Sequence, residues 1–263
     1  DTLGGQPNCM IQYSDGYIYT GFWNSETKDA NFVCVSATDE DPDNPTETKY
    51  ATWTYAVQGG FYWAGAYVTD KYAIVGSDDG ESDSTSDSSY VYCFDKLTGE
   101  VVQKVGPHHG DIRSDISYYD GRIYFTSKGG YLYSYNLKED GTIDTENLIE
   151  PIEIGKMSTS TPAIANGRCY VGSSYGSNFS GTYGISVVDI NAETGAMNLE
   201  YVVYTDAYPQ TSGVVSTGYK GYNYVYFATN GPSGNLWVVK DASGMTEPDE
   251  GSQILYTPEH KQY

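Results

Sequence analysis

The sequence predicts an all-β propeller of four-stranded antiparallel blades, with about five blades in this chain. A short motif recurs five times: a turn built on Asp or Asn with Gly, a strand of alternating aromatic and aliphatic residues, then Gly-Ser or a similar pair. The copies are 55, 50, 46 and 56 residues apart, measured between Gly21, Gly76, Thr126, Gly172 and Ala228. This period is typical of propeller blades. No segment shows a sustained helical period, so we expect almost no helix.

Each repeat predicts four short strands, and the motif supplies the second. Its copies lie at 15–21, 70–77, 120–127, 166–173 and, more loosely, 221–229. Inner strands are expected before it at 9–13, 66–69, 115–119, 161–165 and 214–217. Third strands are clearest at 90–95, 131–135 and 236–239, and Gly-containing turns are expected at 97–100, 193–195 and 242–244. Outer strands are clearest at 52–57, 201–204 and 254–257. The blades then span 8–57, 65–106, 114–154, 159–205 and 211–257.

Length and charge limit the classes of partner. The repeats run through all 263 residues without a linker, which predicts one domain over 1–263. A net charge of -21 argues against nucleic acid and against anionic membrane surfaces as partners. No apolar run is long enough to span a bilayer, and the first five residues do not match a signal peptide, as expected of a mature or trimmed chain.

The four cysteines are expected inside strands as small buried side chains. Cys34 and Cys93 occupy equivalent third-strand positions of neighbouring blades, so they should point the same way. Cys9 and Cys34 should lie two strands apart, roughly 9 to 10 Å, which exceeds the reach of a disulfide. We therefore expect no disulfide among them.

The repeats resemble the quinoprotein-like repeat, the pyrroloquinoline-quinone type of propeller repeat. Two segments match its pattern closely, Ser-Thr-Pro-Ala-Ile-Ala-Asn-Gly-Arg-Cys-Tyr-Val-Gly-Ser at 160–173 and Val-Tyr-Cys-Phe-Asp-Lys-Leu-Thr-Gly-Glu at 91–100. Residues 130–136 supply a further match. The resemblance implies the propeller fold. Propellers of this type usually carry more than five blades, so it favours a larger propeller over a closed ring of five.

The resemblance also sets expectations about cofactors. Dehydrogenases of this family hold the quinone over a vicinal Cys-Cys disulfide and bind calcium near a catalytic Asp. This sequence contains no Cys-Cys pair, and no residue matches the catalytic Asp. Many other members act as binding or assembly scaffolds without a cofactor, among them an outer-membrane assembly lipoprotein. We therefore expect no quinone, with calcium left as an alternative.

Propeller topology predicts where a ligand would bind. Loops joining the second and third strands share one face with loops leading to the next blade, and that face usually carries the ligand site. Aromatic faces beside polar donors suit a polar ligand with an apolar face, such as a sugar or a peptide. The candidate residues on these loops are Trp23, Tyr62, Trp63, His108, His109, Asp111, Arg113, Tyr175 and Tyr208. Because adjacent residues in extended chain point to opposite sides, His108 and His109 are not expected to form one metal or base site.

Two acidic stretches, 39–44 and 78–83, are the weak candidates for a metal. Alternating carboxylates can supply oxygen ligands for calcium, here from Asp39, Asp41, Asp43, Asp79 and Asp83. The Gly and terminal Glu of an EF-hand loop are missing, so we expect flexible, solvated loops instead.

These observations favour a non-enzymatic binding or scaffold module that recognises a glycan, peptide or protein. Few Lys, 28 Tyr and abundant Gly, Ser and Thr are typical of an exported bacterial surface protein, extracellular or at the cell surface. The alternatives are a divergent quinone- or calcium-dependent dehydrogenase and a carbohydrate-active propeller enzyme, for which Asp111 and Asp206 are the nearest carboxylate candidates.

Overall fold

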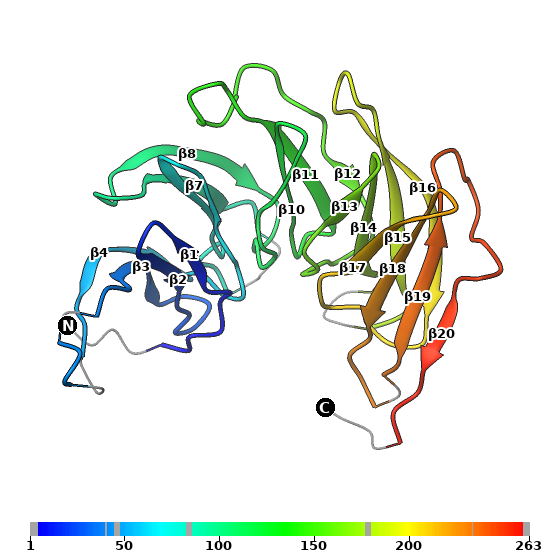
Figure 1. Ribbon diagram of the computed structural model, residues 1–263, viewed down its shortest axis with the longest axis horizontal. Coiled ribbons are helices and arrows are strands. Elements are labelled where there is room, and N and C mark those ends of the chain that lie inside the picture. The colour runs from blue at the N-terminus through cyan, green and yellow to red at the C-terminus, as the bar shows by residue number, and fades with distance from the viewer. Residues whose placement is uncertain are drawn as a thin grey trace. The chain divides into compact units, whose positions relative to one another are not determined.

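All regular structure in the described part of the chain is β-strand. The computed structural model describes residues 5–39, 41–44, 48–82, 86–176, 180–232 and 234–259. Within these ranges, strands β1 to β20 form five antiparallel sheets of four strands each (Figure 1). In every sheet the spatial order of the strands equals their order in the sequence, so each sheet is a simple meander. The described residues contain no helix able to cross a membrane. The predicted four-stranded blades are confirmed.

Blade 1 contains β1 (Gln12–Ser14), β2 (Tyr17–Gly21), β3 (Asp29–Ser36) and β4 (Ala51–Gln58). Blade 2 contains β5 (Tyr67–Val68), β6 (Tyr72–Gly76), β7 (Ser89–Asp95) and β8 (Val101–His108). Blade 3 contains β9 (Ser117–Tyr119), β10 (Arg122–Thr126), β11 (Tyr131–Asn136) and β12 (Ile152–Glu153). Blade 4 contains β13 (Ala163–Ala165), β14 (Arg168–Ser174), β15 (Tyr183–Ile190) and β16 (Met197–Thr205). Blade 5 contains β17 (Val214–Tyr219), β18 (Tyr222–Ala228), β19 (Leu236–Asp241) and β20 (Gln253–Tyr256).

The turns between first and second strands follow from the recurring Asp or Asn with Gly. Both central residues have positive φ, as the two-residue hairpin turn requires: 49° and 85° at Asp15-Gly16, and 52° and 74° at Asn166-Gly167. Blade 2 has Asp70-Lys71 at this point and closes its turn differently. There the Thr69 hydroxyl accepts hydrogen bonds from the backbone N–H groups of Lys71 and Tyr72.

Two predicted boundaries were wrong. Cys9 lies outside a strand, because blade 1 begins at Gln12, and the Cys9 thiol instead donates to the carbonyl oxygen of Phe61. His108 was expected in a loop but is the last residue of β8, where it pairs with Ser89 of β7. Local patterns could not locate these ends, because they depend on partners distant in the sequence.

The chain forms two compact units. Unit 1 comprises Asp1–Ile116 and Leu137–Ile143, and therefore contains blades 1 and 2. Unit 2 comprises Ser117–Asn136 and Asp144–Tyr263, and contains blades 3, 4 and 5. One continuous domain over 1–263 stays a prediction.

Unit 1 has an aromatic core between its two blades. Phe32 of β3 and Phe94 of β7 stack at 5.8 Å between ring centroids, and Trp53 of β4 lies 5.4 Å from Phe94. At one end of this core, the Trp53 indole N–H and the Tyr19 hydroxyl both donate to the carbonyl oxygen of Lys96, at 2.9 and 3.1 Å. The blades are thus joined by packing and by directed hydrogen bonds.

Unit 2 joins blades 4 and 5 through a buried ion pair. Arg168 donates from Nε and Nη2 to the two carboxylate oxygens of Asp241, at 2.9 and 3.0 Å, and both side chains are almost fully buried. The hydroxyls of Tyr170 and Tyr201 donate to the same carboxylate at 2.7 and 2.6 Å. Apolar side chains of both blades, including Val225 and Phe227, pack around this pair.

The four cysteines are buried and free, as predicted. Burial raises the pKa of the Cys93 thiol to about 12, and it also raises the pKa of Cys169 above its usual range. Thiols held protonated in this way are poor nucleophiles and behave as small apolar side chains.

The repeat glycine at the end of the motif leaves space for the loop that leads to the next blade. A Cβ at Gly21 would lie 2.6 Å from Cβ of Phe61, and one at Gly76 would overlap the side chain of Ile112. A Cβ at Gly172 would overlap the carbonyl oxygen of Pro209. In blade 3 the equivalent residue is Thr126, whose hydroxyl donates to the backbone of the following loop, at Ser160. The last residue of the motif therefore determines, in blades 1 to 4, the path of the loop that leads to the next blade.

Replacing this glycine tests the constraint. We expect Gly172→Ala to lower the free energy of unfolding by about 1 to 3 kcal/mol, because the Pro209 carbonyl moves only if the whole loop moves. Gly76→Ala is the parallel variant in unit 1, and we expect a comparable loss because the clashing Cγ2 and Cβ of Ile112 lie next to the backbone. Urea unfolding measures both, and unchanged stability in Gly172→Ala would contradict the close packing.

A second substitution tests the buried ion pair. Asp241→Asn leaves the guanidinium of Arg168 buried without its bidentate carboxylate, so we expect a loss of about 3 to 5 kcal/mol in unfolding free energy. Asp70→Asn, at an exposed turn, is the control and should unfold like the unmodified chain. Calorimetric melting of both variants gives the comparison, and equal melting temperatures would refute a structural role for the pair.

Candidate functional site

Four loops of unit 1 meet at one edge of its blades. They are 22–28 after β2, 59–66 after β4, the described residues 77–82 and 86–88 after β6, and 109–116 after β8. In a meander, loops after the second and fourth strands leave from the same edge. The predicted residues Trp23, Tyr62, Trp63, Asp111 and Arg113 all lie on these loops.

Three aromatic rings and a guanidinium form one assembly at this edge. Trp23 stacks on Tyr62 with ring centroids 4.6 Å apart, and Tyr62 stacks on Trp63 at 4.3 Å. The guanidinium carbon of Arg113 lies 4.7 Å from the Tyr62 ring centroid. All three rings are only partly buried. We call Trp23, Tyr62 and Trp63 the aromatic cluster. The structure thus brings together side chains that the sequence places 40 residues apart, between positions 23 and 63.

Trp63 has a backbone conformation that is rare for its residue type. Its φ is 62°, in the left-handed region, which costs a bulky residue about 1 to 3 kcal/mol. The loop holds this conformation because neighbouring Phe61 and Ala64 are fully buried. The Phe61 N–H also donates to the Phe22 carbonyl at 2.9 Å. Such strain is characteristic of functional positions.

The aromatic cluster also contains an unsatisfied donor. The indole Nε1 of Trp23 is buried and has no hydrogen-bond partner in the described ranges. A buried donor without a partner costs about 1 to 3 kcal/mol. The unpaired indole of Trp23 and the strained backbone of Trp63 both lower the stability of this edge.

Arg113 anchors the aromatic cluster to a buried charge network. Its Nε and Nη2 donate to the two oxygens of Asp78 at 3.1 and 2.7 Å. Nη2 also lies 2.7 Å from Glu26 and 2.8 Å from Asp111. Asp78 and Asp111 are fully buried, whereas 35% of the Glu26 side chain is exposed. Each of the four loops contributes to the assembly, because Trp23 and Glu26 share one loop and Tyr62, Asp78 and Arg113 come from the others.

The network contains more carboxylates than cations. Burial, and then the neighbouring charge of Asp111, raise the pKa of Asp78 well above its usual range, although Arg113 opposes this. Burial works against the charge of Arg113, but Asp78 and Asp111 raise the pKa of its guanidinium, which remains charged.

The acidic loop after β6 is ordered at its start, contrary to the solvated loop that was expected. Asp79 is buried, and its carboxylate accepts hydrogen bonds from the N–H of Glu81 at 2.9 Å and from the hydroxyl of Ser86 at 2.7 Å. The Asp79 N–H in turn donates to Asp111 at 3.0 Å. Asp79 therefore organises its own loop. Asp83 lies outside the described residues.

The other acidic stretch lies at the surface. Asp39, Asp41 and Asp43 are exposed, and Asp41 accepts a hydrogen bond from the Asp43 N–H at 3.3 Å. The metal-type grouping in the described ranges is instead Glu26, Asp78 and Asp111, whose ligand atoms lie within 4.8 Å of one another. The guanidinium of Arg113 already contacts all three carboxylates, so it supplies the positive charge there.

The two histidines have different surroundings. His108 is buried, and burial lowers its pKa to about 4. His109 is exposed enough to pair with Asp87, with 2.6 Å between Nδ1 and the carboxylate.

Tyr175 and Tyr208 lie in unit 2. Tyr175 packs 5.9 Å from Tyr204, between ring centroids. Tyr208 is 3% exposed, and its hydroxyl accepts the N–H of Thr159 at 2.8 Å. The burial of Tyr208 and His108 leaves them little surface for a ligand.

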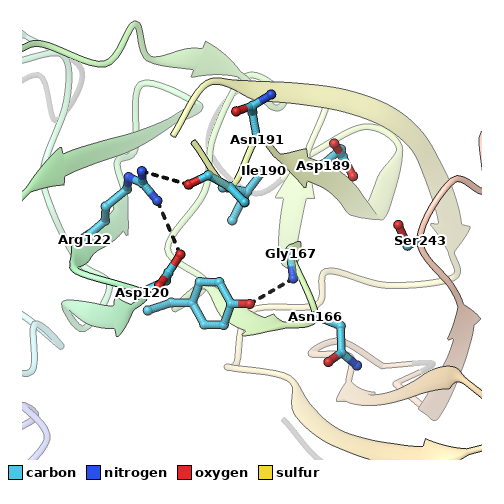
Figure 2. Close-up of a pocket in the computed structure, with 10 residues that line it drawn as sticks. Asp120, Arg122, Asn166, Gly167, Asp189, Ile190, Asn191 and Ser243 are labelled. Carbon is cyan, nitrogen blue, oxygen red and sulfur yellow. Dashed lines mark hydrogen bonds and ion pairs between the residues drawn. The ribbon is translucent and has the colours of Figure 1, made fainter. Parts of the chain in front are cut away.

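Sequence reasoning missed a pocket in unit 2, at the opposite edge of the blades (Figure 2). It is formed by turns between first and second strands and between third and fourth strands. Its lining residues include Tyr119, Asp120, Arg122, Asn166 and Asp189. The Asp-Gly and Asn-Gly turns were visible in the sequence, but their pattern indicates only a turn.

Comparison with known proteins supports the fold. No family model matches the chain, and no curated protein matches it. Among solved structures, BamB from Moraxella catarrhalis aligns with a TM-score of 0.54 and 15% identity, over 95% of this chain and 63% of that one. A putative 6-phosphogluconolactonase from Bacteroides uniformis aligns at 0.49 and 12%, over 97% and 88% of the two chains. The quinohemoprotein alcohol dehydrogenase from Comamonas testosteroni aligns at 0.46 and 14%, over 74% and 36%.

The strand topology and the similarity to BamB place the chain in a structural class. It is an all-β propeller of four-stranded blades, similar in fold to propellers of the quinoprotein-like repeat type. This confirms the resemblance that the repeats predicted. The chain spans less than two thirds of the length of the BamB chain.

The expectation that the chain lacks a quinone site of the dehydrogenase type stays a prediction. Such a site needs adjacent cysteines, whereas the cysteines here are at positions 9, 34, 93 and 169 and all are buried. The carboxylate group that could resemble a calcium site contains Arg113.

The charge network predicts a pH dependence of stability. The folded Asp78 carboxyl binds its proton more tightly than the unfolded one, whose pKa is about 3.9. The free energy of unfolding should therefore fall as the pH rises from about 4 through the raised pKa. Asp78→Asn removes this titration, so we expect it to reduce the fall between about pH 4 and pH 8 by about 1 kcal/mol or more. Urea unfolding across this range tests it with Asp43→Asn as control, and equal slopes in all three proteins would contradict it.

Proposed function

We propose that the chain is a non-enzymatic binding module that recognises a glycan at the loop edge of unit 1. The observation that carries the proposal is the aromatic cluster, three partly buried rings from two loops, in which Trp23 and Trp63 stack on Tyr62 and Tyr62 also contacts Arg113. Large aromatic side chains that remain accessible and rigid are typical binding anchors.

The surroundings of the aromatic cluster suit a polyhydroxylated ligand. Aromatic rings pack against the C–H faces of a sugar, while polar groups nearby bind its hydroxyls. Asn24 is exposed beside Trp23, and Glu26 keeps a third of its side chain accessible while it pairs with Arg113. A peptide with an apolar side chain is the second ligand that this surface would accept.

The site is organised before a ligand binds. The ring stack, the left-handed Trp63 and the bidentate Arg113–Asp78 pair hold the side chains in place. Rigid side chains lose little entropy on binding, which supports affinity from a small contact area.

The carboxylates favour binding over catalysis. Asp111 is fully buried, where its two oxygens contact the Asp79 N–H and Arg113. Asp206 accepts hydrogen bonds from Asn235 at 2.5 Å and from the indole of Trp237 at 2.7 Å. Both nearest candidates for a glycosidase acid or nucleophile thus have structural partners.

An extracellular or cell-surface location in a bacterium accords with this function. The net charge of -21 favours solubility, and surface glycans or the proteins that carry them are the partners this module would meet there.

A binding screen tests the proposal. Glycan and peptide arrays should identify a ligand, and titration with the best one should change the fluorescence of Trp23 and Trp63. We expect Trp63→Ala to weaken binding by about 10- to 100-fold, because it removes an anchor of the cluster. Tyr50→Ala is the control, since Tyr50 is 89% exposed in unit 1 and lies outside the cluster.

The outcomes distinguish the ligand classes. Glycan binding that is lost in Trp63→Ala and kept in Tyr50→Ala supports the proposal. Binding of peptides alone would replace the glycan with a peptide ligand at the same cluster. A ligand whose affinity is unchanged in Trp63→Ala would refute the site.

A further inference from the structure

The pocket in unit 2 is a cavity of about 470 Å³ among the turns of blades 3, 4 and 5. This volume lies in the range of small-molecule sites. Figure 2 shows Asp120 and Arg122 on one side of it, Asp189 and Ser243 on the other, and Asn166 next to Gly167. The pocket is separate from the aromatic cluster and does not depend on the proposed function.

Equivalent turns of neighbouring blades position the lining groups. Asp120 and Asn166 each occupy the first central position of a hairpin turn, with φ of 49° and 52°. The two turns are tied together, because the Gly167 N–H donates to the Tyr119 hydroxyl at 3.0 Å (Figure 2). Tyr119 therefore keeps its own hydroxyl proton for another acceptor.

Arg122 supports the pocket, and its Nε and Nη2 both donate to acceptors of the protein. Only 10% of its side chain is exposed. Nε donates to Asn136 at 3.0 Å, and Nη2 donates to the carbonyl oxygens of Ala192 and Glu193 at 3.2 and 3.3 Å. Its Nη1 lies 3.7 Å from Asp120, which is a long contact. The hydrogen bonds of Nη2 thus link blade 3 to blade 4. The long contact of Nη1 leaves Asp120 weakly paired.

Two carboxylates of the pocket remain accessible. Asp120 is 62% exposed and Asp189 is 43% exposed. Asp189 contacts Arg168 through Oδ1 only, at 3.3 Å, and Arg168 is already paired with Asp241. The amide nitrogen of Asn166 donates to Asn223 at 2.7 Å, which leaves its oxygen as an acceptor. Acceptors and negative charge therefore exceed donors and positive charge in this cavity.

We propose that this pocket binds an organic cation, whose ammonium or guanidinium group pairs with the accessible carboxylate of Asp120 or of Asp189. Such a group supplies several N–H donors and a positive charge, which match the carboxylates and the Asn166 oxygen. Among the lining residues the positive charge is that of Arg122, and only 10% of its side chain is exposed. The same group occurs on a free polyamine and on a Lys or Arg side chain of a peptide.

Titration with simple probes tests the proposal. The unmodified chain, labelled with ¹⁵N, is titrated with 1,4-diaminobutane, with N-acetyl-arginine amide, and with the neutral butane-1,4-diol and glucose. We expect saturable shifts at the Gly167 and Ser243 amides with the cations, with a dissociation constant of about 0.1 to 1 mM because both carboxylates are partly solvated. Added salt should weaken this binding by screening.

Substitutions identify the partners. Asp189→Asn and Asp120→Asn should each weaken cation binding by about tenfold, as loss of a charge-assisted hydrogen bond does. Asp70→Asn, at the corresponding turn of blade 2, removes one charge outside the pocket and should leave the affinity unchanged. Native amide spectra of each variant confirm that it is folded.

The probes also decide the source and the competing ligands. Tighter binding of the diamine indicates a free polyamine, and tighter binding of the arginine amide indicates a peptide side chain. Equal or tighter binding of diol or glucose, unchanged affinity in both Asp variants, or no saturable shift with either cation up to about 20 mM would overturn the proposal.

Discussion

The structure depends on the close approach between the end of each second strand and the loop that leads to the next blade. Gly21 and Gly76 provide this space in unit 1, for Phe61 and Ile112, and Gly172 provides it for Pro209 in unit 2. A buried loop residue fixes the path of the chain on both sides of it. The residues next to Phe61 and Ile112 are those of the candidate site, so the packing constraint of the repeat also determines where functional side chains lie.

Strain and charge at the loop edge of unit 1 follow from this anchoring. Because Phe61 and Ala64 are buried on either side, Tyr62 and Trp63 must turn outward, and Trp63 takes a left-handed backbone conformation. Arg113 follows Ile112 in the same way, and its guanidinium is held between Asp78, Asp111 and the Tyr62 ring. The strained backbone lowers local stability, but it holds the aromatic and charged groups in a rigid arrangement. Such rigidity is the usual physical basis of a preorganised binding site.

The two edges of the blades carry different chemistry. The loop edge of unit 1 presents aromatic rings beside a network in which Asp78, Asp111 and Arg113 are buried and paired. The turn edge of unit 2 presents carboxylates that are partly solvated and weakly paired. Tight two-residue turns favour Asp or Asn at their first central position, although blade 5 has Lys220 there, so acceptor side chains are common at that edge. Longer loops have no such requirement and can hold aromatic residues.

The sequence alone determined the blade architecture, because strand alternation, Asp-Gly turns and a period of about 50 residues are local signals that the structure obeys. It also named Trp23, Tyr62, Trp63, Asp111 and Arg113, because the meander puts their loops at one edge. Tertiary structure decided the rest. Glu26 and Asp78 join Arg113 from loops 87 and 35 residues away, and Tyr208 and His108 are buried by partners that no local pattern reveals. The pocket among Asp120, Asn166 and Asp189 exists only when turns of separate blades meet. The alternation of side chains along a strand indicates which face of that strand each residue occupies. Burial and ion pairing depend instead on how one blade packs against the next.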